Sequence, residues 1–287
     1  MSQTYNVPKQ QAPFNVPVAY AVSIGFAFAV SIVYGLLSVS FPIPYFHPVF
    51  TFGFAIVLGV GVRVITKALK IVPRRISLTI TLATSALAWY FQWVVYILFS
   101  IIGGDFLDVY ISDSSLVFYP WEVARIMNIL FTEGAWYIGE ILFKGWPLLL
   151  FWFGEVIMLL VIPLYLVYKQ PLSPFSTLTN KWYRKYVLHK DFESIAVKER
   201  FEEAIEISLT NTIDKLKNGG ITYFCRISIF YLKDEEHQYL RVENISRDKT
   251  GKNERPLTVI DLYPISKEDT AYLMEKYHAK KAFYFDY

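Results

Sequence analysis

The chain has 287 residues, of which 18% are aromatic and only 18% are charged, with a net charge of +3 at pH 7 and a mean hydropathy of +0.33. About 25% of the residues of a soluble domain are charged, so this composition excludes an ordinary soluble domain and indicates a membrane protein. Residues 1–168 hold eight Lys and Arg, whereas residues 169–287 hold twenty together with eighteen acids, which predicts two parts. A single cysteine, Cys225, excludes an internal disulfide and a multi-cysteine metal site.

Four apolar segments are long enough to cross a hydrocarbon core of about 30 Å as helices. They cover residues 17–40, 48–69, 76–102 and 146–168, and residues 1–16 precede them as an N-terminal segment. The first segment is longer than the core of a signal peptide, which is about 7 to 15 residues, so we expect it to remain as a span. The sequence therefore predicts a four-helix transmembrane domain over residues 17–168.

The loop between the second and third segments fixes the expected orientation. This loop and the end of the second segment before it carry five cations and no acid, namely Arg63, Lys67, Lys70, Arg74 and Arg75. The positive-inside rule places such a loop in the cytoplasm. The opposite loop, residues 103–145, carries six acids and two cations and is expected outside. Both termini are then expected in the cytoplasm.

The outer loop contains YPWEVARIMNILFTEG, which begins at a proline suited to a first helical turn and ends at Gly134. Its polar and apolar residues repeat every three or four positions on opposite sides, which predicts an amphipathic helix on the membrane surface or packed over the bundle. Such a helix either covers the outer mouth of the bundle or docks a partner or gates a substrate, and both readings stay open.

The second span carries small residues that favour close helix packing. Ala55 and Gly59 are four residues apart, with Gly53 and Gly61 nearby. Small side chains at this spacing let a neighbouring backbone approach closely. The sequence leaves open whether that neighbour belongs to the same chain or to another.

Residues 169–194 are predicted to be a turn-rich linker followed by a basic aromatic segment. The segment is rich in cations and aromatic rings, and its candidate lipid-headgroup contacts are Lys181, Trp182, Arg184, Lys185 and Lys190. Anionic lipid is therefore an expected contact, with each cation near the surface worth about 1 kcal/mol. Nucleic acid is not expected, because the rest of the tail is nearly charge-balanced.

Residues 195–287 are predicted to form a small cytosolic α+β domain. A helix is expected over residues 195–216, followed by strands in ITYFCRISIFYL, HQYLRVENIS and LTVIDLY. Ser266 followed by Glu268 and Asp269 is a helix-start signal for DTAYLMEKY, and AFYFDY is expected to be a last short strand.

The chain lacks the sequence patterns of common active sites. It has no phosphate-binding loop, no histidine pair at the spacing of zinc ligands, and no hydrolase signature. We therefore expect no catalytic residue, metal or cofactor. His47, next to Pro48 at the outer surface, is expected to be an interfacial residue.

Glu155 is the one acid inside a predicted span. Counting from Trp146 places it about 14 Å below the outer boundary, close to the midplane. The span tolerates it, because an ionised side chain there costs about 3 kcal/mol while each of the many Leu, Ile, Phe and Val residues returns about 0.3 to 0.6 kcal/mol. Its expected partners lie at similar depth, namely Ser31, Thr84 and Ser85, with Arg63 as an ionic alternative.

Two roles for Glu155 stay open. A neutral carboxyl that donates a hydrogen bond would hold helices together. A carboxyl that handles protons or ions is the other reading, because intramembrane acids are functional candidates. The second reading lacks a second acid, a broken helix or an inverted repeat.

Four stretches, TEGAWYIGE, KGWPLLLFWFGEVIMLL, NKWY and YLRVENISRDKTGK, resemble a group of uncharacterised bacterial inner-membrane proteins. The resemblance covers the chain from about residue 50 onward. It implies four spans, an outer amphipathic helix, a small cytosolic C-terminal domain and a location in the bacterial inner membrane. It carries no activity and no catalytic residue.

The sequence thus predicts an α-helical membrane protein with four spans and a C-terminal α+β domain. The first hypothesis is a non-enzymatic scaffold, sensor or accessory subunit that contacts the bilayer and other membrane proteins, or a second copy of itself. The second hypothesis is a small transporter or channel that uses Glu155 as a proton or cation site. A third, a lipid-modifying or lipid-sensing protein, depends on the basic segment at Lys181 to Lys190 alone.

Overall fold

A computed structural model describes residues 15–41, 46–102, 119–134, 136–138, 141–170, 173–248 and 254–282. The described residues belong to two compact units, a helical unit that ends at Gln170 and a sheet unit that follows it. Each unit has its own hydrophobic core, and each is described separately below.

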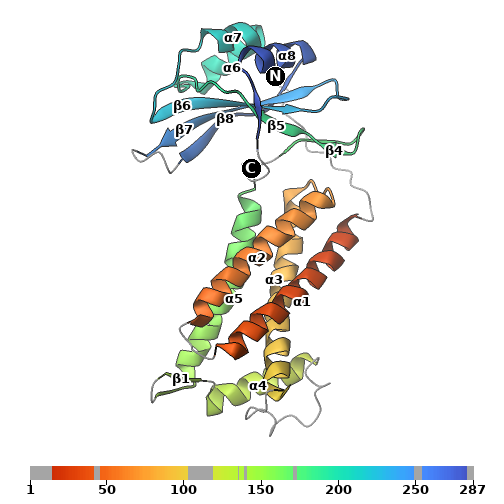
Figure 1. The fold of residues 1–287 in the computed structure, drawn as a ribbon, viewed down its shortest axis with the longest axis vertical. Helices are drawn as coiled ribbons and strands as arrows, with labels where there is room; N and C mark the ends of the chain where they lie inside the picture. The colour runs from red at the N-terminus through yellow and green to blue at the C-terminus, as the bar shows by residue number, and fades with distance from the viewer. Residues whose placement is uncertain are drawn as a thin grey trace. The chain divides into compact units, whose positions relative to one another are not determined.

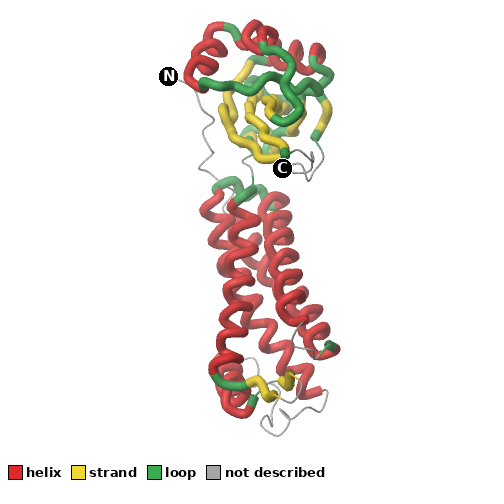
Figure 2. The backbone as a smooth tube through the Cα atoms, turned by 90° about the vertical axis from the view of Figure 1, so that its left-hand side faces the viewer, coloured by secondary structure: helices red, strands yellow, loops and turns green. Residues whose placement is uncertain are grey.

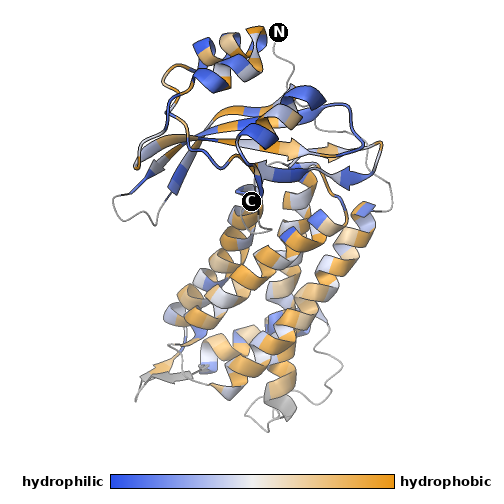
Figure 3. Cartoon of the chain, turned by 45° about the horizontal axis from the view of Figure 1, so that its top comes forward, coloured by the Kyte–Doolittle hydropathy of each residue, from blue (hydrophilic) through white to orange (hydrophobic). Residues whose placement is uncertain are grey.

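The helical unit contains four helices long and apolar enough to cross a membrane, as predicted. They are α1 (Asn15–Ser40), α2 (His47–Ala68), α3 (Arg74–Ile102) and α5 (Trp146–Tyr168) (Figure 1). Figure 3 shows these helices dominated by hydrophobic residues. Large apolar side chains such as Val33, Val49 and Phe153 are exposed on their surface, as expected where lipid is the solvent.

Small and hydroxyl residues fill the interior side of α1. The buried positions recur every three or four residues and are Ala19, Ser23, Ala27, Ser31, Tyr34, Gly35 and Ser38. This spacing places them on one face of the helix, where α1 packs against α3 and α2. Small side chains therefore let α1 lie close to its neighbours.

Helix α4 (Pro120–Glu133) confirms the amphipathic helix expected between the third and fourth spans. Pro120 is in its first turn and Gly134, with φ of 104°, follows its last residue. Its buried side chains Val123, Ile126 and Leu130 pack against Trp93 and Trp152 of α3 and α5. The helix thus packs on the bundle, and a short hairpin of β1 (Trp136–Ile138) and β2 (Ile141–Phe143) follows it.

The sheet unit contains a five-stranded antiparallel sheet with strand order β8-β7-β6-β5-β9. The strands are β5 (Arg184–Val187), β6 (Tyr223–Tyr231), β7 (Gln238–Arg247), β8 (Glu254–Ile265) and β9 (Lys280–Lys281), and a small hairpin of β3 (Phe175–Ser176) and β4 (Lys181–Trp182) precedes them. The three longest strands lie in the three segments that were predicted as strands. The last predicted strand, residues 282–287, lies almost wholly outside the described residues.

Three helices cover one face of the sheet: α6 (Lys198–Ile207), α7 (Leu209–Lys215) and α8 (Lys267–Lys276) (Figure 2). The single helix expected over residues 195–216 is wrong, because Ser208 adopts an extended conformation with φ of −159° and divides it. Ser208 and Thr212 are weak helix formers. The Thr212 hydroxyl lies 2.8 Å from the Ala204 carbonyl and 2.7 Å from the Ser208 carbonyl, so it connects the two helices across the break.

Strand β8 departs from regular pairing at two points. Val259 is an extra residue between two paired positions, and Asp261 and Leu262 together face Arg241 of β7. Leu262 has a φ of 53°, the backbone conformation of a bulge residue. The second bulge places the Asp261 carboxylate 2.7 Å from the Arg241 guanidinium, whose side chain is only 5% exposed.

Helix α8 offers a test of local capping. The Ser266 hydroxyl accepts a hydrogen bond from the Asp269 backbone amide, as its sequence position predicted. Ser266→Ala should destabilise the sheet unit by about 1 kcal/mol, measured by chemical unfolding of the detergent-solubilised chain. Ser208 precedes α7 without a side-chain cap bond, so Ser208→Ala is the matched control and should change stability little. Equal losses in the two variants would refute the capping role.

Candidate functional site

Glu155 lies on the interior face of α5 and is 5% exposed. The buried residues of α5 recur every three or four positions and are Leu148, Trp152, Glu155, Leu159, Pro163 and Val167. Such spacing forms one continuous stripe on a helix, so the carboxyl shares the face that packs against the other helices. Glu155 therefore faces a helix seam and not lipid.

Hydroxyl groups from two other helices contact the same carboxyl oxygen. The Tyr34 hydroxyl of α1 is 3.2 Å from Glu155 Oε1, and the Thr51 hydroxyl of α2 is 3.3 Å from it. Tyr34 and Thr51 are themselves 2.9 Å apart, and the Thr51 hydroxyl is 2.9 Å from the His47 carbonyl. Three helices thus converge on one polar cluster inside the bundle.

The hydroxyl groups are the donors of this cluster. The Tyr34 and Thr51 hydroxyls donate towards Glu155 Oε1, and the Thr51 hydroxyl also lies within reach of the His47 carbonyl. Each hydroxyl has one proton, so the four contacts share two donors and Glu155 is the common acceptor.

The two contacts to Glu155 Oε1 are the longest in the cluster, at 3.2 and 3.3 Å. The carboxyl is thus a shared acceptor that joins α5 to α1 and α2.

A small cavity of about 30 Å³ adjoins the cluster. It is lined by residues of all five helices of the unit, which are Tyr34, Ser38, His47, Gln92, Trp93, Tyr96, Leu130, Trp152 and Glu155. Buried polar atoms of these residues, among them Gln92 Oε1, Trp93 Nε1 and Trp152 Nε1, make no hydrogen bond to any described residue. A cavity of this size holds one or two water molecules, which can serve such groups.

The arrangement limits the chemistry that this site can perform. A carboxyl, two hydroxyls and a water-sized cavity can bind a proton or a water molecule, but the volume is too small for an organic substrate. Among the residues that the structure describes, no three His, Cys, Asp or Glu side chains lie together as metal ligands would.

The partners expected for Glu155 at equal depth are corrected. The hydroxyls of Ser31 and Thr84 bond to carbonyls of their own helices, at Ala27 and Ile80, and Ser31 also lies 3.4 Å from the Ala88 carbonyl of α3. The Ser85 hydroxyl is buried without a hydrogen bond to a described residue. Equal depth places two residues at the same level of the bundle but does not say which way each side chain faces. The face of the helix on which a residue lies decides which residues it contacts.

Arg63 is not the partner of Glu155 either. It lies twelve residues from Thr51 along α2, or about 18 Å. Tyr34, Thr51 and Gln92 were not predicted as site residues. His47 was expected at the interface, but it is 4% exposed and lines the cavity. The repeat of small and hydroxyl residues through Ser31 and Tyr34 of α1 was the signal that could have indicated the cluster.

The small residues of α2 meet neighbours in the same chain. A side chain at Gly59 would lie 2.9 Å from the Pro163 Cα atom of α5, and one at Gly61 would collide with the Phe26 ring of α1. Ala55 is fully buried. Gly53, by contrast, has no atom within 4 Å of the position that a side chain would take. Gly53 therefore makes no close contact of this kind with a described residue.

The basic aromatic segment forms strands, which corrects part of its predicted role. Lys185 of β5 is 8% exposed, and Lys190 lies over the rings of Phe192 and Tyr277. Trp182 packs edge-on against Phe175, with ring centroids 5.0 Å apart. Lys181 and Arg184 remain exposed. Alternation along a strand buries every second residue, so the five candidates cannot present one continuous surface.

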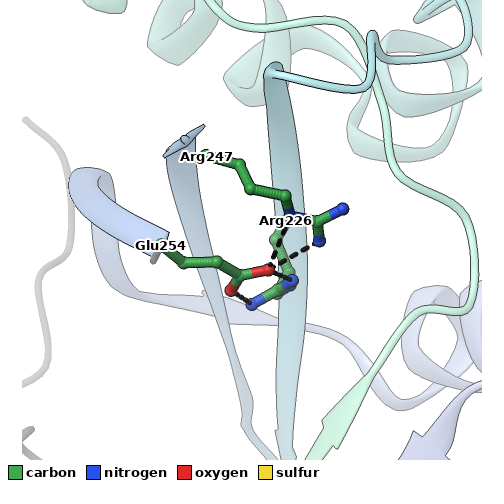
Figure 4. Close-up of polar contacts among 3 residues, drawn as sticks. All are labelled: Arg226, Arg247 and Glu254. Atoms are coloured by element: carbon green, nitrogen blue, oxygen red, sulfur yellow. Dashed lines mark hydrogen bonds and ion pairs between the residues drawn. The ribbon is translucent and has the colours of Figure 1, made fainter. Parts of the chain in front are cut away.

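An ion cluster joins the three longest strands at one end of the sheet. Glu254 of β8 receives hydrogen bonds from Arg226 of β6 at 2.8 and 3.1 Å and from Arg247 of β7 at 2.6 Å (Figure 4). Both guanidinium groups also lie over the Phe224 ring. A neighbouring recess of about 810 Å³ carries Arg247 and Arg255 together with acids, so it favours neither ion sign.

This cluster should make the sheet unit sensitive to acid. Hydrogen bonds from Arg226, together with Arg247, lower the pKa of Glu254 from 4.5 to about 2. Because the folded pKa is depressed, the stabilisation is fully present above pH 4.5 and is lost as pH falls towards 2. Glu254→Gln should cost about 1–2 kcal/mol at neutral pH, less any solvent screening, and little near pH 2.

Chemical unfolding of the detergent-solubilised chain, followed by circular dichroism across this pH range, measures the difference. Glu275→Gln is the control, because the exposed Glu275 carboxylate pairs with no cation among the described residues. If Glu254→Gln and wild type lose stability in parallel on acidification, the ion cluster does not contribute as described.

Comparison of the chain with protein families, with curated proteins and with solved structures finds no match in any of the three.

Proposed function

We propose that this chain is an integral membrane scaffold, sensor or accessory subunit that makes protein contacts on both sides of the membrane. The observation that supports it is the use of Glu155 in packing: its carboxyl oxygen lies within hydrogen-bonding distance of hydroxyls from α1 and α2. A carboxyl engaged in this way joins helices, which leaves the surfaces of α4 and the sheet unit for partners.

Location in the bacterial inner membrane with both termini inside belongs to the same proposal. The cations at the junction of α2 and α3, including Lys70, Arg74 and Arg75, support this orientation by the positive-inside rule. The resemblance of the sequence motifs to bacterial four-span proteins supports location in the bacterial inner membrane.

Helix α4 offers a surface for such contacts. Trp121 is 63% exposed and lies beside the exposed Tyr119, with ring centroids 4.7 Å apart. Exposed aromatic pairs are common both in protein interfaces and at the headgroup level of a bilayer. If a partner protein binds at Trp121, replacing Trp121 should release that partner. If Trp121 only contacts the bilayer, its replacement should leave any bound protein in place.

Mass measurement of the chain extracted in several mild detergents and in polymer-bounded lipid discs tests the proposal. We expect a complex of constant stoichiometry that contains a second protein or a second copy. Trp121→Ser should release a partner bound at α4 while the chain stays folded. A monodisperse monomer under all of these conditions would overturn the proposal.

A second candidate function is a small proton or cation pathway, favoured by the cavity beside Glu155. In this role Glu155 releases and takes up a proton through the water-sized space that it shares with Gln92. Purified chain in liposomes with a pH-sensitive dye should then conduct protons, and Glu155→Gln should abolish the flux without unfolding the protein. Absence of flux in wild type, or equal flux in the variant, eliminates this candidate.

A further inference from the structure

A groove runs between α3 and α5 on the surface of the helical unit. It has a volume of about 500 Å³ and is lined by apolar and aromatic side chains, namely Leu78, Thr79, Leu82, Val161, Leu164, Tyr165 and Tyr168. Among these lining residues, Thr79 has the one aliphatic hydroxyl. That hydroxyl already accepts a hydrogen bond from Tyr20 and donates one to the Ile76 carbonyl. The groove therefore suits a hydrocarbon chain.

Two cations lie at one end of this groove and contact its aromatic rings. The Arg74 guanidinium is 5.4 Å from the centre of the Tyr168 ring and donates a hydrogen bond to the Gln170 carbonyl. The Lys169 ammonium is 5.7 Å from the centre of the Tyr165 ring. The rings of Tyr165 and Tyr168 thus link the apolar groove to the two charges.

Neither cation is neutralised by an acid in the part of the chain that the structure describes. Arg74 and Lys169 form no ion pair with a described residue. Residues 15–102 contain no Asp or Glu at all. The exposed Arg75 adds a third positive charge beside them. This end of the groove therefore has an excess of positive charge.

The length of the groove matches one leaflet of a bilayer. Leu82 lies eight residues beyond Arg74, or about 12 Å along α3. Half of a hydrocarbon core of about 30 Å is about 15 Å. An acyl chain with its headgroup at Arg74 would thus follow the groove through most of its own leaflet.

We propose that this groove binds an anionic phospholipid, with the phosphate between Arg74 and Lys169 and one acyl chain along Leu78, Leu82, Val161 and Leu164. A guanidinium binds phosphate through two parallel N–H groups, and the Lys169 ammonium adds a compact charge. Basic pockets between transmembrane helices recognise anionic headgroups in this manner. The site differs from the basic aromatic segment and is independent of the partner proposal.

Native mass spectrometry of the full chain tests this site. The chain is reconstituted with equal amounts of phosphatidylglycerol and phosphatidylcholine and then released into the gas phase, and the retained lipids are counted. Wild type should retain phosphatidylglycerol in preference to phosphatidylcholine. Arg74→Gln with Lys169→Gln should weaken retention by about 25-fold, since each cation contributes roughly fivefold in affinity. Lys215→Gln with Lys217→Gln removes the same charge from exposed positions of the sheet unit and should change nothing.

A steric pair of variants tests the acyl chain separately. Val161 in the groove is 56% exposed and Val64 on α2 is 48% exposed. Val161→Trp should lower phosphatidylglycerol retention, and Val64→Trp should not. Because Arg74 also bonds to Gln170, Lys169→Gln alone is measured if the double variant unfolds, and it should still weaken retention about fivefold.

Competition with inorganic phosphate tests whether the site binds a lipid headgroup or a free phosphate ion. Excess phosphate should leave lipid retention unchanged, because it lacks the acyl chain. Displacement of the lipid by phosphate, equal retention of the two lipids by wild type, or unchanged retention by the cation variants would each overturn the proposal.

Discussion

Glu155→Ala is expected to destabilise the helical unit by about 2–4 kcal/mol, the range for a buried truncation that leaves a cavity and loses hydrogen bonds. The change enlarges the space beside Trp152 and removes the carboxyl that links Tyr34 to α5. Unfolding in mixed micelles of a mild and a denaturing detergent, followed by circular dichroism, measures the loss.

Glu155→Gln is the matched control for charge and shape. An amide donates and accepts hydrogen bonds as a neutral carboxyl does, so this variant should lie within about 1 kcal/mol of wild type. An infrared difference spectrum between wild type and the glutamine variant should contain the carbonyl band of a protonated carboxylic acid. A carboxylate band in its place would refute a neutral Glu155.

Gly59→Val should be the second large effect, costing the bundle about 1–3 kcal/mol through overpacking. The new side chain would meet the backbone of Pro163, which cannot rotate away, as well as Leu166. The same detergent unfolding measures the cost.

Gly53→Ala is the control in the same helix. Its added methyl group meets open space, so the variant should be neutral, or more stable by less than about 1 kcal/mol through helix propensity. If Gly53→Ala and Gly59→Val are equally destabilising, backbone flexibility explains the presence of glycine at these positions, and close helix packing does not.

The sequence was sufficient for the spans and the long strands because those elements depend on local patterns. An apolar run longer than the bilayer core, as from Trp146 to Tyr168, has few alternatives to a helix. The strand through Cys225 and Ile227 alternates apolar residues without helix-forming spacing. Capping at Ser266 is equally local, and it too was predicted.

The environment of Glu155 depends on long-range packing, which no single segment contains. Tyr34 and Thr51 lie 121 and 104 residues from it in the chain. Residue counting gave the depth of Glu155, but the rotation of α1 and α2 about their axes selects Tyr34 and Thr51 instead of Ser31. The same limitation explains Lys185, whose charge suggested a surface and whose strand position buried it.

The bulged strand β8 has a consequence for how the sheet unit can meet another protein. Among the described residues it forms one margin of the sheet, where an unpaired strand normally invites a further strand to join it. Pro256 and Pro264 each lack an amide donor, and the bulges at Val259 and Leu262 interrupt the regular pattern that an added strand would need. Partners that lengthen a sheet by strand addition, and the aggregation that follows the same route, are therefore disfavoured at this margin. Recognition of the sheet unit there would have to proceed through side chains.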